Sequence, residues 1–119
     1  MLYLLLEVYE PAYREDIYLA LQSIGIHRAL SIDARNIAAA LSDEQTFFTG
    51  FFSSDKIESG NVLLIQAQVS SREKVREFLS NLREGGVDID KQNILSLTVV
   101  PALISFSSEH GLQEDGGNT

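Results

Sequence analysis

The feature of this sequence that most restricts its fold is the order of its hydrophobic patterns. Between Met1 and about Ile104, a strand pattern is followed by a helix, two strands, a second helix and a last strand. The two halves of this unit echo each other, because in each half an amphipathic helix follows a strand, ends at glycine and leads into another strand. Each helix has a single apolar stripe, so both must cover the same side of one sheet. The order therefore predicts an α+β sandwich of the type βαββαβ, with two helices on one face of an antiparallel four-stranded sheet.

The first half begins with a strand whose side chains alternate between two faces. These faces are predicted to carry Leu2, Leu4, Leu6 and Val8 on one side, and Tyr3, Leu5, Glu7 and Tyr9 on the other. The sequence Glu10-Pro11 opens the first helix, since proline is well tolerated at the first helical position. The buried stripe of this helix is predicted to consist of Tyr13, Ile17, Ala20, Leu21 and Ile24. Gly25 then ends the helix in the left-handed conformation, and a second strand runs from about His27 to Arg35.

The second half repeats this arrangement from Val62 onward. A third strand is predicted over 62–69, and the second helix begins with Ser70 as N-cap and Glu73 as its capping-box partner. Gly85-Gly86 ends the helix, and its buried stripe is predicted to consist of Val75, Phe78, Leu79 and Leu82. The last strand runs from about Ile94 to Val100, and Pro101 is expected at its end or at an edge of the sheet.

The sheet face that the helices leave uncovered is predicted to be mixed in character. Its expected residues are Ser31, Asp33, Arg35, Gln66, Gln68, Ser96 and Thr98, together with Tyr3, Leu5 and Tyr9. This face is too polar for a core and too apolar for simple exposure. It is either a solvated face of an antiparallel sheet or a subunit interface. We favour the interface, because tyrosines among glutamines are typical of a wet contact surface.

Composition and charge exclude several classes of function. The 119 residues suffice for one domain, and the absence of cysteine excludes disulfides, thiolate metal sites and a cysteine nucleophile. A net charge of −8 argues against a nucleic-acid partner and against binding to a membrane surface. The N-terminal apolar run lacks a basic region and stops too early for a signal peptide or a membrane span. We therefore expect a cytoplasmic protein without membrane insertion.

Two segments lie outside the regular pattern. The stretch from Asn36 to Gly60 is a long connection between neighbouring strands, and such connections are usually functional or disordered. The stretch from Ser107 to Thr119 is polar, acidic and rich in glycine, which predicts a disordered tail. The chain is therefore divided into one domain over 1–106, with an insertion at 36–60, and a tail over 107–119.

Within the insertion, four of the six phenylalanines occur in six consecutive positions. They are Phe47, Phe48, Phe51 and Phe52, and they form either a helical turn or a tight hairpin about Thr49-Gly50. So much aromatic area either completes the core of its own subunit or contacts a neighbouring subunit, a partner protein or an apolar ligand. The preceding residues, 37–41, are predicted to form a short helix that is stopped by Ser42-Asp43.

The best candidate for an anion site follows the second helix. Its residues are Arg83, Gly85, Gly86 and Lys91, because paired glycines let backbone N–H groups approach a phosphate and the two cations supply charge. An ordinary helix C-cap explains the same glycines and is the interpretation that we favour. Asp88 and Asp90 could hold Mg²⁺ beside a nucleotide, although such pairs are more often part of a solvated turn. Neither His27 nor His110 has a motif neighbour, so no metal site and no catalytic residue is predicted.

With this order and these lengths, residues 1–104 resemble a divergent member of the PII signal-transduction family and its PII-like relatives. The resemblance rests on the opening from Tyr3 to Pro11, the helix end from Leu21 to Ile26, the insertion after the second strand, and the turn from Arg83 to Lys91. The family's B-loop reads arginine, threonine, glycine, any residue, isoleucine, then glycine-aspartate-glycine-lysine. Without a gap, Arg83, Gly85, Val87 and Lys91 fall on matching or similar positions, whereas Glu84 replaces the threonine.

The resemblance implies a ferredoxin-like fold and a non-enzymatic, regulatory protein that assembles as a homotrimer. The mixed sheet face would line the centre of the trimer, and a small ligand, either an anion or a nucleotide, would bind in clefts between subunits. The expected ligand-binding residues are Arg35, Asn36, Arg83, Gly85, Gly86 and Lys91. Binding would order the segment 36–60 and so change which protein partner docks there.

Two other functions remain open at this point. One is an ACT-like dimer that senses an amino acid near Gly25, in which case the protein would contain two subunits rather than three. The other is a small dimeric ferredoxin-like enzyme, in which the four phenylalanines close a cavity and His27 acts as a base. No pair of residues in the sequence has a spacing that demands acid–base chemistry, which argues against the enzyme.

Overall fold

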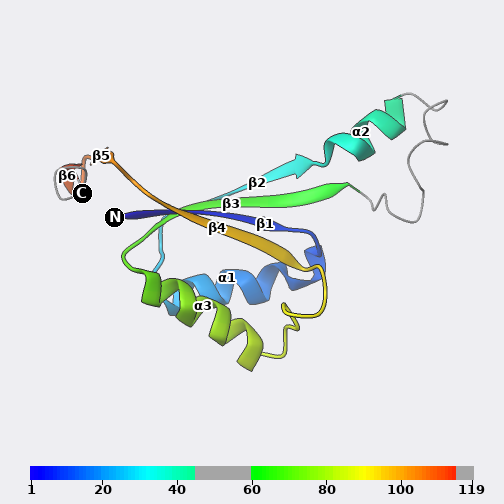
Figure 1. Cartoon of the computed structure of the whole chain (residues 1–119), viewed down its shortest axis with the longest axis horizontal. Helices are drawn as coiled ribbons and strands as arrows, with labels where there is room; N and C mark the ends of the chain where they lie inside the picture. Colours follow the sequence, from blue (N-terminus) through cyan, green and yellow to red (C-terminus); the bar gives the residue numbers. More distant parts are fainter. Residues whose placement is uncertain (45–59, 115–119) are drawn as a thin grey trace.

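The computed structural model describes residues 1–44 and 60–114, and its core is an antiparallel sheet with helices on one face (Figure 1). The elements are β1 (Leu2–Val8), η1 (Pro11–Tyr13), α1 (Arg14–Ser23), β2 (Ala29–Arg35), α2 (Ile37–Glu44), β3 (Asn61–Val69), α3 (Arg72–Glu84), β4 (Leu95–Pro101), β5 (Ile104–Ser107) and β6 (Gly111–Glu114). The sheet has the strand order β2-β3-β1-β4, and every pair in it is antiparallel. The predicted βαββαβ sandwich is therefore confirmed, and Pro101 ends β4 at an edge of the sheet.

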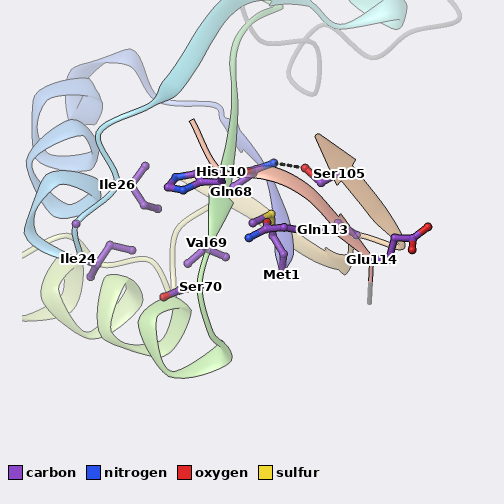
Figure 2. Close-up of a pocket in the computed structure, with 12 residues that line it drawn as sticks. Met1, Ile24, Ile26, Gln68, Val69, Ser70, Ser105, His110, Gln113 and Glu114 are labelled. Carbon is purple, nitrogen blue, oxygen red and sulfur yellow. Dashed lines mark hydrogen bonds between the residues drawn. The ribbon is translucent and has the colours of Figure 1, made fainter. Parts of the chain in front are cut away.

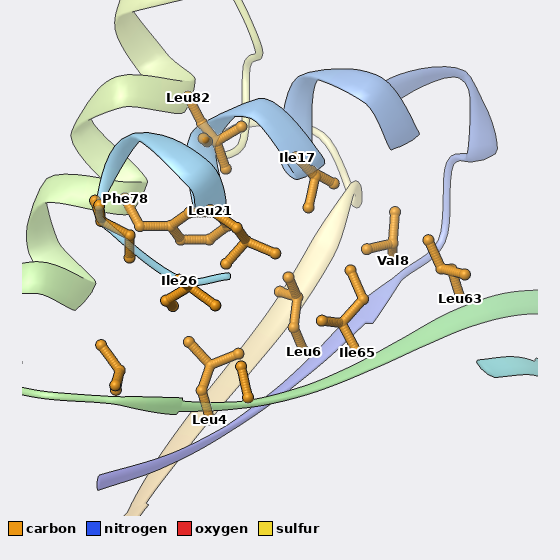
Figure 3. Close-up of a cluster of buried hydrophobic side chains, with 14 of the residues drawn as sticks. Leu4, Leu6, Val8, Ile17, Leu21, Ile26, Leu63, Ile65, Phe78 and Leu82 are labelled. Carbon is orange, nitrogen blue, oxygen red and sulfur yellow. The ribbon is translucent and has the colours of Figure 1, made fainter. Parts of the chain in front are cut away.

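The core lies between the sheet and the two helices α1 and α3 (Figure 3). In β1 and β3, every second side chain is buried, as the period of a half-covered strand requires. Ile17 and Leu21 of α1, and Phe78 and Leu82 of α3, point toward these strands and are buried as predicted. Phe78 belongs to this cluster and is the largest of its fully buried side chains.

Both helices end in the same way. In α1, the N–H of Gly25 donates to the carbonyl of Gln22 and the N–H of Ile26 donates to that of Leu21, in the pattern of a Schellman motif. Gly86 and Val87 repeat these bonds at the end of α3. The φ angles of Gly25 and Gly86 are 86° and 90°, which confirms the left-handed conformation predicted for Gly25.

The start of α3 differs from the prediction by one residue. The N-cap is Ser71, whose hydroxyl accepts a hydrogen bond from the Lys74 N–H at 3.2 Å. Ser70 instead occupies the bend between β3 and the helix. Glu73 is therefore the second helical residue and not the third, so the predicted capping box of Ser70 and Glu73 is wrong.

The second and third strands extend beyond the end of β1 and carry α2 at their tip (Figure 1). The side chain of Asn36 caps this helix, because its Oδ1 accepts from the N–H groups of Ala38 and Ala39 at 2.9 and 3.4 Å. The N–H of Asn36 also donates to the carbonyl of Gly60 at 2.7 Å. A side chain at Gly60 would collide with Ala39, since an added Cβ would lie 2.5 Å from the Ala39 Cβ. These contacts hold the first turn of α2 against the residue that precedes β3.

The predicted helix in the insertion is confirmed, but its predicted end is wrong. Instead of stopping at Ser42-Asp43, α2 continues through both residues to Glu44. Two polar residues alone do not end a helix, because they neither remove a backbone donor nor favour the left-handed conformation. The four phenylalanines Phe47, Phe48, Phe51 and Phe52 lie outside the described residues.

Residues 107–114 are not the disordered tail that their composition predicts. They complete a two-stranded hairpin, β5–β6, in which Phe106 pairs with Leu112 and Gly111 has a φ of 73°. We call this element the C-terminal hairpin. Its apolar residues alternate with serine and glutamine, a strand pattern that the polar composition of the surrounding segment conceals. The last five residues, 115–119, are outside the described part of the chain.

None of the helices in the described residues combines the length and the apolar character that crossing a membrane requires.

Candidate functional site

The pairing of β2 with β3 decides which side chains lie on the uncovered side of the sheet. Ser31 is opposite Ile65, Asp33 is opposite Leu63, and both partners belong to the core side. Ser31, Asp33 and Arg35 therefore point to the side of the helices, and their predicted place on the uncovered face is wrong. They remain exposed because β2 is an edge strand with little helical cover, so polar residues are tolerated there.

The uncovered side is consequently more apolar than predicted. We call it the open face, and the register gives its members as Tyr3, Leu5, Glu7, Leu30, Ile32, Ala34, Val62, Leu64, Gln66, Gln68, Ser96, Thr98 and Val100. Three large apolar side chains of this face are exposed in the subunit, with relative accessibilities of 67% for Leu30, 46% for Ile32 and 40% for Val100. An apolar surface of this kind is typical of a contact with another molecule.

Two tyrosine hydroxyls donate to polar groups of the open face. The hydroxyl of Tyr3 donates to Oε1 of Gln66 at 2.8 Å, and that of Tyr9 donates to Glu7 at 3.1 Å. Burial raises the pKa of the Tyr9 hydroxyl, and the carboxylate of Glu7 raises it further. Tyr9 therefore stays protonated and remains a donor at neutral pH. Of the predicted tyrosines and glutamines, Tyr3, Gln66 and Gln68 occupy this face in the strand register.

The predicted anion site is a helix end whose groups already have partners within the subunit. The N–H groups of Gly85, Gly86 and Val87 all donate to carbonyls of α3, so none of them points to a ligand. Arg83 forms two hydrogen bonds with Asp90, from Nε to Oδ2 at 2.8 Å and from Nη2 to Oδ1 at 3.0 Å. The two glycines thus serve the helix C-cap, and the exposed Lys91 is the cation of this turn that no described ion pair engages.

The Arg83–Asp90 pair gives a prediction for pH dependence. The hydrogen bonds and charge of Arg83 hold the pKa of the Asp90 carboxyl below its ordinary value. Because the folded-state pKa is depressed, the pair stabilises the fold above the pKa of the unfolded chain, about 3.9, and this stabilisation is lost as the pH falls through the folded-state pKa. NMR titration should show the Asp90 midpoint rising in Arg83→Gln but not in Arg72→Gln, which removes an arginine at the other end of α3. Equal midpoints in all three proteins would show that the pair does not form in solution.

Within one subunit, the structure does not bring all the predicted ligand-binding residues together. Arg83, Gly85, Gly86 and Lys91 lie at the end of α3 and in the connection from α3 to β4, whereas Arg35 and Asn36 lie where β2 leads into α2 (Figure 1). The side chain of Asn36 is engaged in capping α2.

A pocket that sequence reasoning missed lies beside the C-terminal hairpin (Figure 2). It is open, has a volume of about 640 Å³, and lies between the end of α1, the end of β3 and the hairpin. Its apolar floor contains Ile24, Ile26 and Val69, and its polar lining contains Gln68, Ser70, Ser105, His110, Gln113 and Glu114. The pocket could not be predicted from the sequence, because half of its polar lining belongs to the segment that was expected to be a disordered tail.

Among the described residues, no three histidine, aspartate or glutamate side chains lie close enough together to hold a metal ion. Nε2 of His110 lies 3.8 Å from Oε2 of Glu109, and both side chains are exposed. The groups present supply hydrogen bonds and apolar contact.

Comparison with known proteins gives similarity of fold. No family model matches the sequence, and no curated protein matches it. The structure is similar to the crystal structure of Arabidopsis thaliana PII bound to citrate, with a TM-score of 0.53 and 16% sequence identity over 92% of this chain and 85% of that chain. It is also matched to a PII-like signaling protein from Thermus thermophilus, with a TM-score of 0.45 and 17% identity over 83% of this chain and 86% of that chain. The similarity to PII confirms the expected ferredoxin-like fold.

Proposed function

We propose that this chain is a cytoplasmic, non-enzymatic regulatory protein of the PII-like kind, which assembles as a homotrimer and senses a small anionic ligand. The observation that carries the proposal is the open face, an apolar surface on the side of the sheet that no helix covers. The fold that the chain shares with PII supports it.

The open face supports assembly because its apolar side chains gain free energy when they leave water. Each fully buried leucine or isoleucine contributes about 1.5–3 kcal/mol, and Leu30 and Ile32 are neighbours on the same face of β2. The hydrogen-bonded Tyr3 and Gln66 would allow such an interface to exclude water without stranding polar groups. In the proposed trimer, the open faces of the subunits line the centre.

The segment from 36 to 60 supports the proposed mechanism because of where its ends are held. It leaves β2 at Asn36 and returns to β3 at Gly60, on the ribbon that projects beyond the rest of the sheet (Figure 1). The proposed ligand binds where this ribbon meets the Gly85–Lys91 turn of a neighbouring subunit. Its binding favours one arrangement of the segment and so determines which protein partner docks.

The charges at that junction favour an anion. Lys91 is exposed and Arg35 lies at the tip of the ribbon, whereas Arg83 is paired with Asp90. Because no backbone N–H of Gly85 or Gly86 is free, the ligand would be held by side-chain charge rather than by a phosphate-binding loop. A polycarboxylate therefore suits the site as well as a nucleotide does, and the PII structure that resembles this chain is bound to citrate.

A thermal-shift screen tests the proposed function. Nucleotides, citrate and other carboxylates, bicarbonate and amino acids are added separately, and a ligand that binds the folded protein raises its melting temperature. A ligand at 100 times its dissociation constant stabilises by about 2.7 kcal/mol, enough for a shift of several degrees.

We expect an anion to give this shift, and we expect Lys91→Ala to abolish it. Lys74→Ala is the matched control, because Lys74 is an exposed lysine at the far end of α3 that pairs with Glu77. A shift that is the same in Lys91→Ala and in the unmodified protein would refute the proposed site. A shift with amino acids alone, together with a two-subunit mass in solution, would instead favour the ACT-like dimer.

A further inference from the structure

The C-terminal hairpin turns its polar side toward its own subunit and its apolar side away from it. On the inner side, Oγ of Ser105 accepts a hydrogen bond from the Gln68 side chain at 3.1 Å, and Ser105 and Gln113 line the pocket (Figure 2). On the outer side, Ile104, Phe106 and Leu112 have relative accessibilities of 58%, 72% and 61%. An element that covers the core of its own chain turns its apolar side inward, whereas this hairpin turns its apolar side outward.

Polar contacts join the hairpin to its own subunit at its exposed surface. They include the Gln68–Ser105 bond, an exposed ion pair between Arg28 and Glu109 at 3.2 Å, and the Ala102 N–H donating to the Met1 carbonyl at 2.9 Å. Exposed ion pairs stabilise by about 0–1 kcal/mol, and an isolated two-stranded hairpin is marginally stable in water. Because the described residues leave the apolar side of the hairpin exposed, a partner molecule that covers it would stabilise the hairpin.

We propose that the outer side of the C-terminal hairpin is an assembly arm, which packs against a second copy of this chain. The inference rests on the proposed function, because it extends the assembly that the open face implies. The hairpin of one subunit would pack against a different surface of the next subunit, so the two surfaces in each contact would not be the same. Contacts of this head-to-tail kind close into a ring when the rotation between neighbouring subunits closes, as the proposed trimer requires.

The distribution of charge favours a second copy over a different partner. The whole chain has a net charge of −8, so two copies repel wherever their ordinary surfaces meet. The open face carries one charged side chain, Glu7, and the outer side of the hairpin carries one, Glu114. Two surfaces that are nearly uncharged on an otherwise acidic chain are the places where copies can meet without this repulsion. A basic partner would instead bind the acidic surfaces.

A matched pair of leucines tests the arm. Leu112 and Leu19 are exposed to the same extent, 61% and 64%, but Leu19 lies on α1, away from both the hairpin and the open face. By analytical ultracentrifugation, Leu112→Ser should raise the dissociation constant of the assembly at least tenfold, and Leu19→Ser should leave it unchanged. The double variant Phe106→Ser/Leu112→Ser should have the mass of one 13.2 kDa chain at micromolar concentration. Circular dichroism verifies that each variant is folded.

The outcomes separate this inference from the proposed function. If both hairpin variants assemble like the unmodified protein while Ile32→Asp does not, the arm is refuted and assembly through the open face stands. If the unmodified protein is itself a monomer at high concentration, both ideas are refuted.

Photo-crosslinking provides a second test, which does not require a variant that weakens the assembly. A photo-reactive benzoylphenylalanine in place of Phe106 should give a covalent product of two chains on irradiation, whereas the same group in place of Leu19 should not. Products confined to single chains would overturn the proposal.

Discussion

Replacing Ile32 with aspartate is expected to convert the assembled protein into monomers without unfolding the subunit. Ile32 lies on the open face opposite Leu64, and it is partly exposed in the isolated subunit, so a charge there costs the monomer little. In an assembly that covers this face, each copy would bury an unpaired carboxylate, which costs several kcal/mol. We expect the dissociation constant to rise at least about 100-fold, equivalent to about 2.8 kcal/mol. Sedimentation equilibrium or light scattering measures this change directly.

Ser31→Asp is the control for this experiment. It introduces the same charge one residue away on the same strand, but Ser31 lies opposite Ile65 and points to the other side of the sheet. Assembly should survive it. If Ile32→Asp keeps the mass of the unmodified protein, the open face is not an interface and the proposed trimer loses its physical basis.

Replacing Phe78 with alanine should remove much of the stability of the subunit. Phe78 has no exposed surface and lies in the main core cluster between α3 and the sheet (Figure 3). Truncating a buried phenylalanine typically costs about 3–5 kcal/mol, because apolar contacts are lost and a cavity remains. A domain of this size has about 5–15 kcal/mol in total, so the variant should unfold at a much lower urea concentration.

The sequence contains a phenylalanine that serves as the control for Phe78. Phe106 is mostly exposed, and its truncation to alanine should change the free energy of unfolding by less than about 0.5 kcal/mol. Both substitutions are best made in the Ile32→Asp background, so that assembly does not contribute to the stability measured. Equal losses for Phe78→Ala and Phe106→Ala would contradict the assignment of the core.

Most of the fold could be predicted because its elements have long, regular patterns. The alternation from Leu2 to Val8 and the stripe that contains Ile17 and Leu21 have the periods of a strand and a helix, and the structure buries them accordingly. The boundaries were less accurate, as Ser71 rather than Ser70 caps α3. Boundaries depend on one or two dihedral angles, which hydrophobic periodicity does not specify.

The candidate surfaces were harder to predict because they depend on contacts between distant segments. The residues of the Gly85–Lys91 turn are adjacent in the sequence, yet the pairing of Arg83 with Asp90 and the use of the amides by α3 appear only in three dimensions. The C-terminal hairpin was missed altogether, because its short strands lie in a segment whose average composition is that of a disordered tail. Its pocket was missed with it.

Period-two alternation in the sequence already specifies which side chains share a surface, because it groups Leu30 with Ile32 and Ser31 with Asp33 in any arrangement of the strand. Which of these two groups faces the helices is not specified by that pattern. That choice is made by the register of β2 on β3, through hydrogen bonds to residues some thirty positions away. A strand pattern is symmetrical with respect to the two sides of a sheet, and only packing against the helices makes one side the core and leaves the other uncovered.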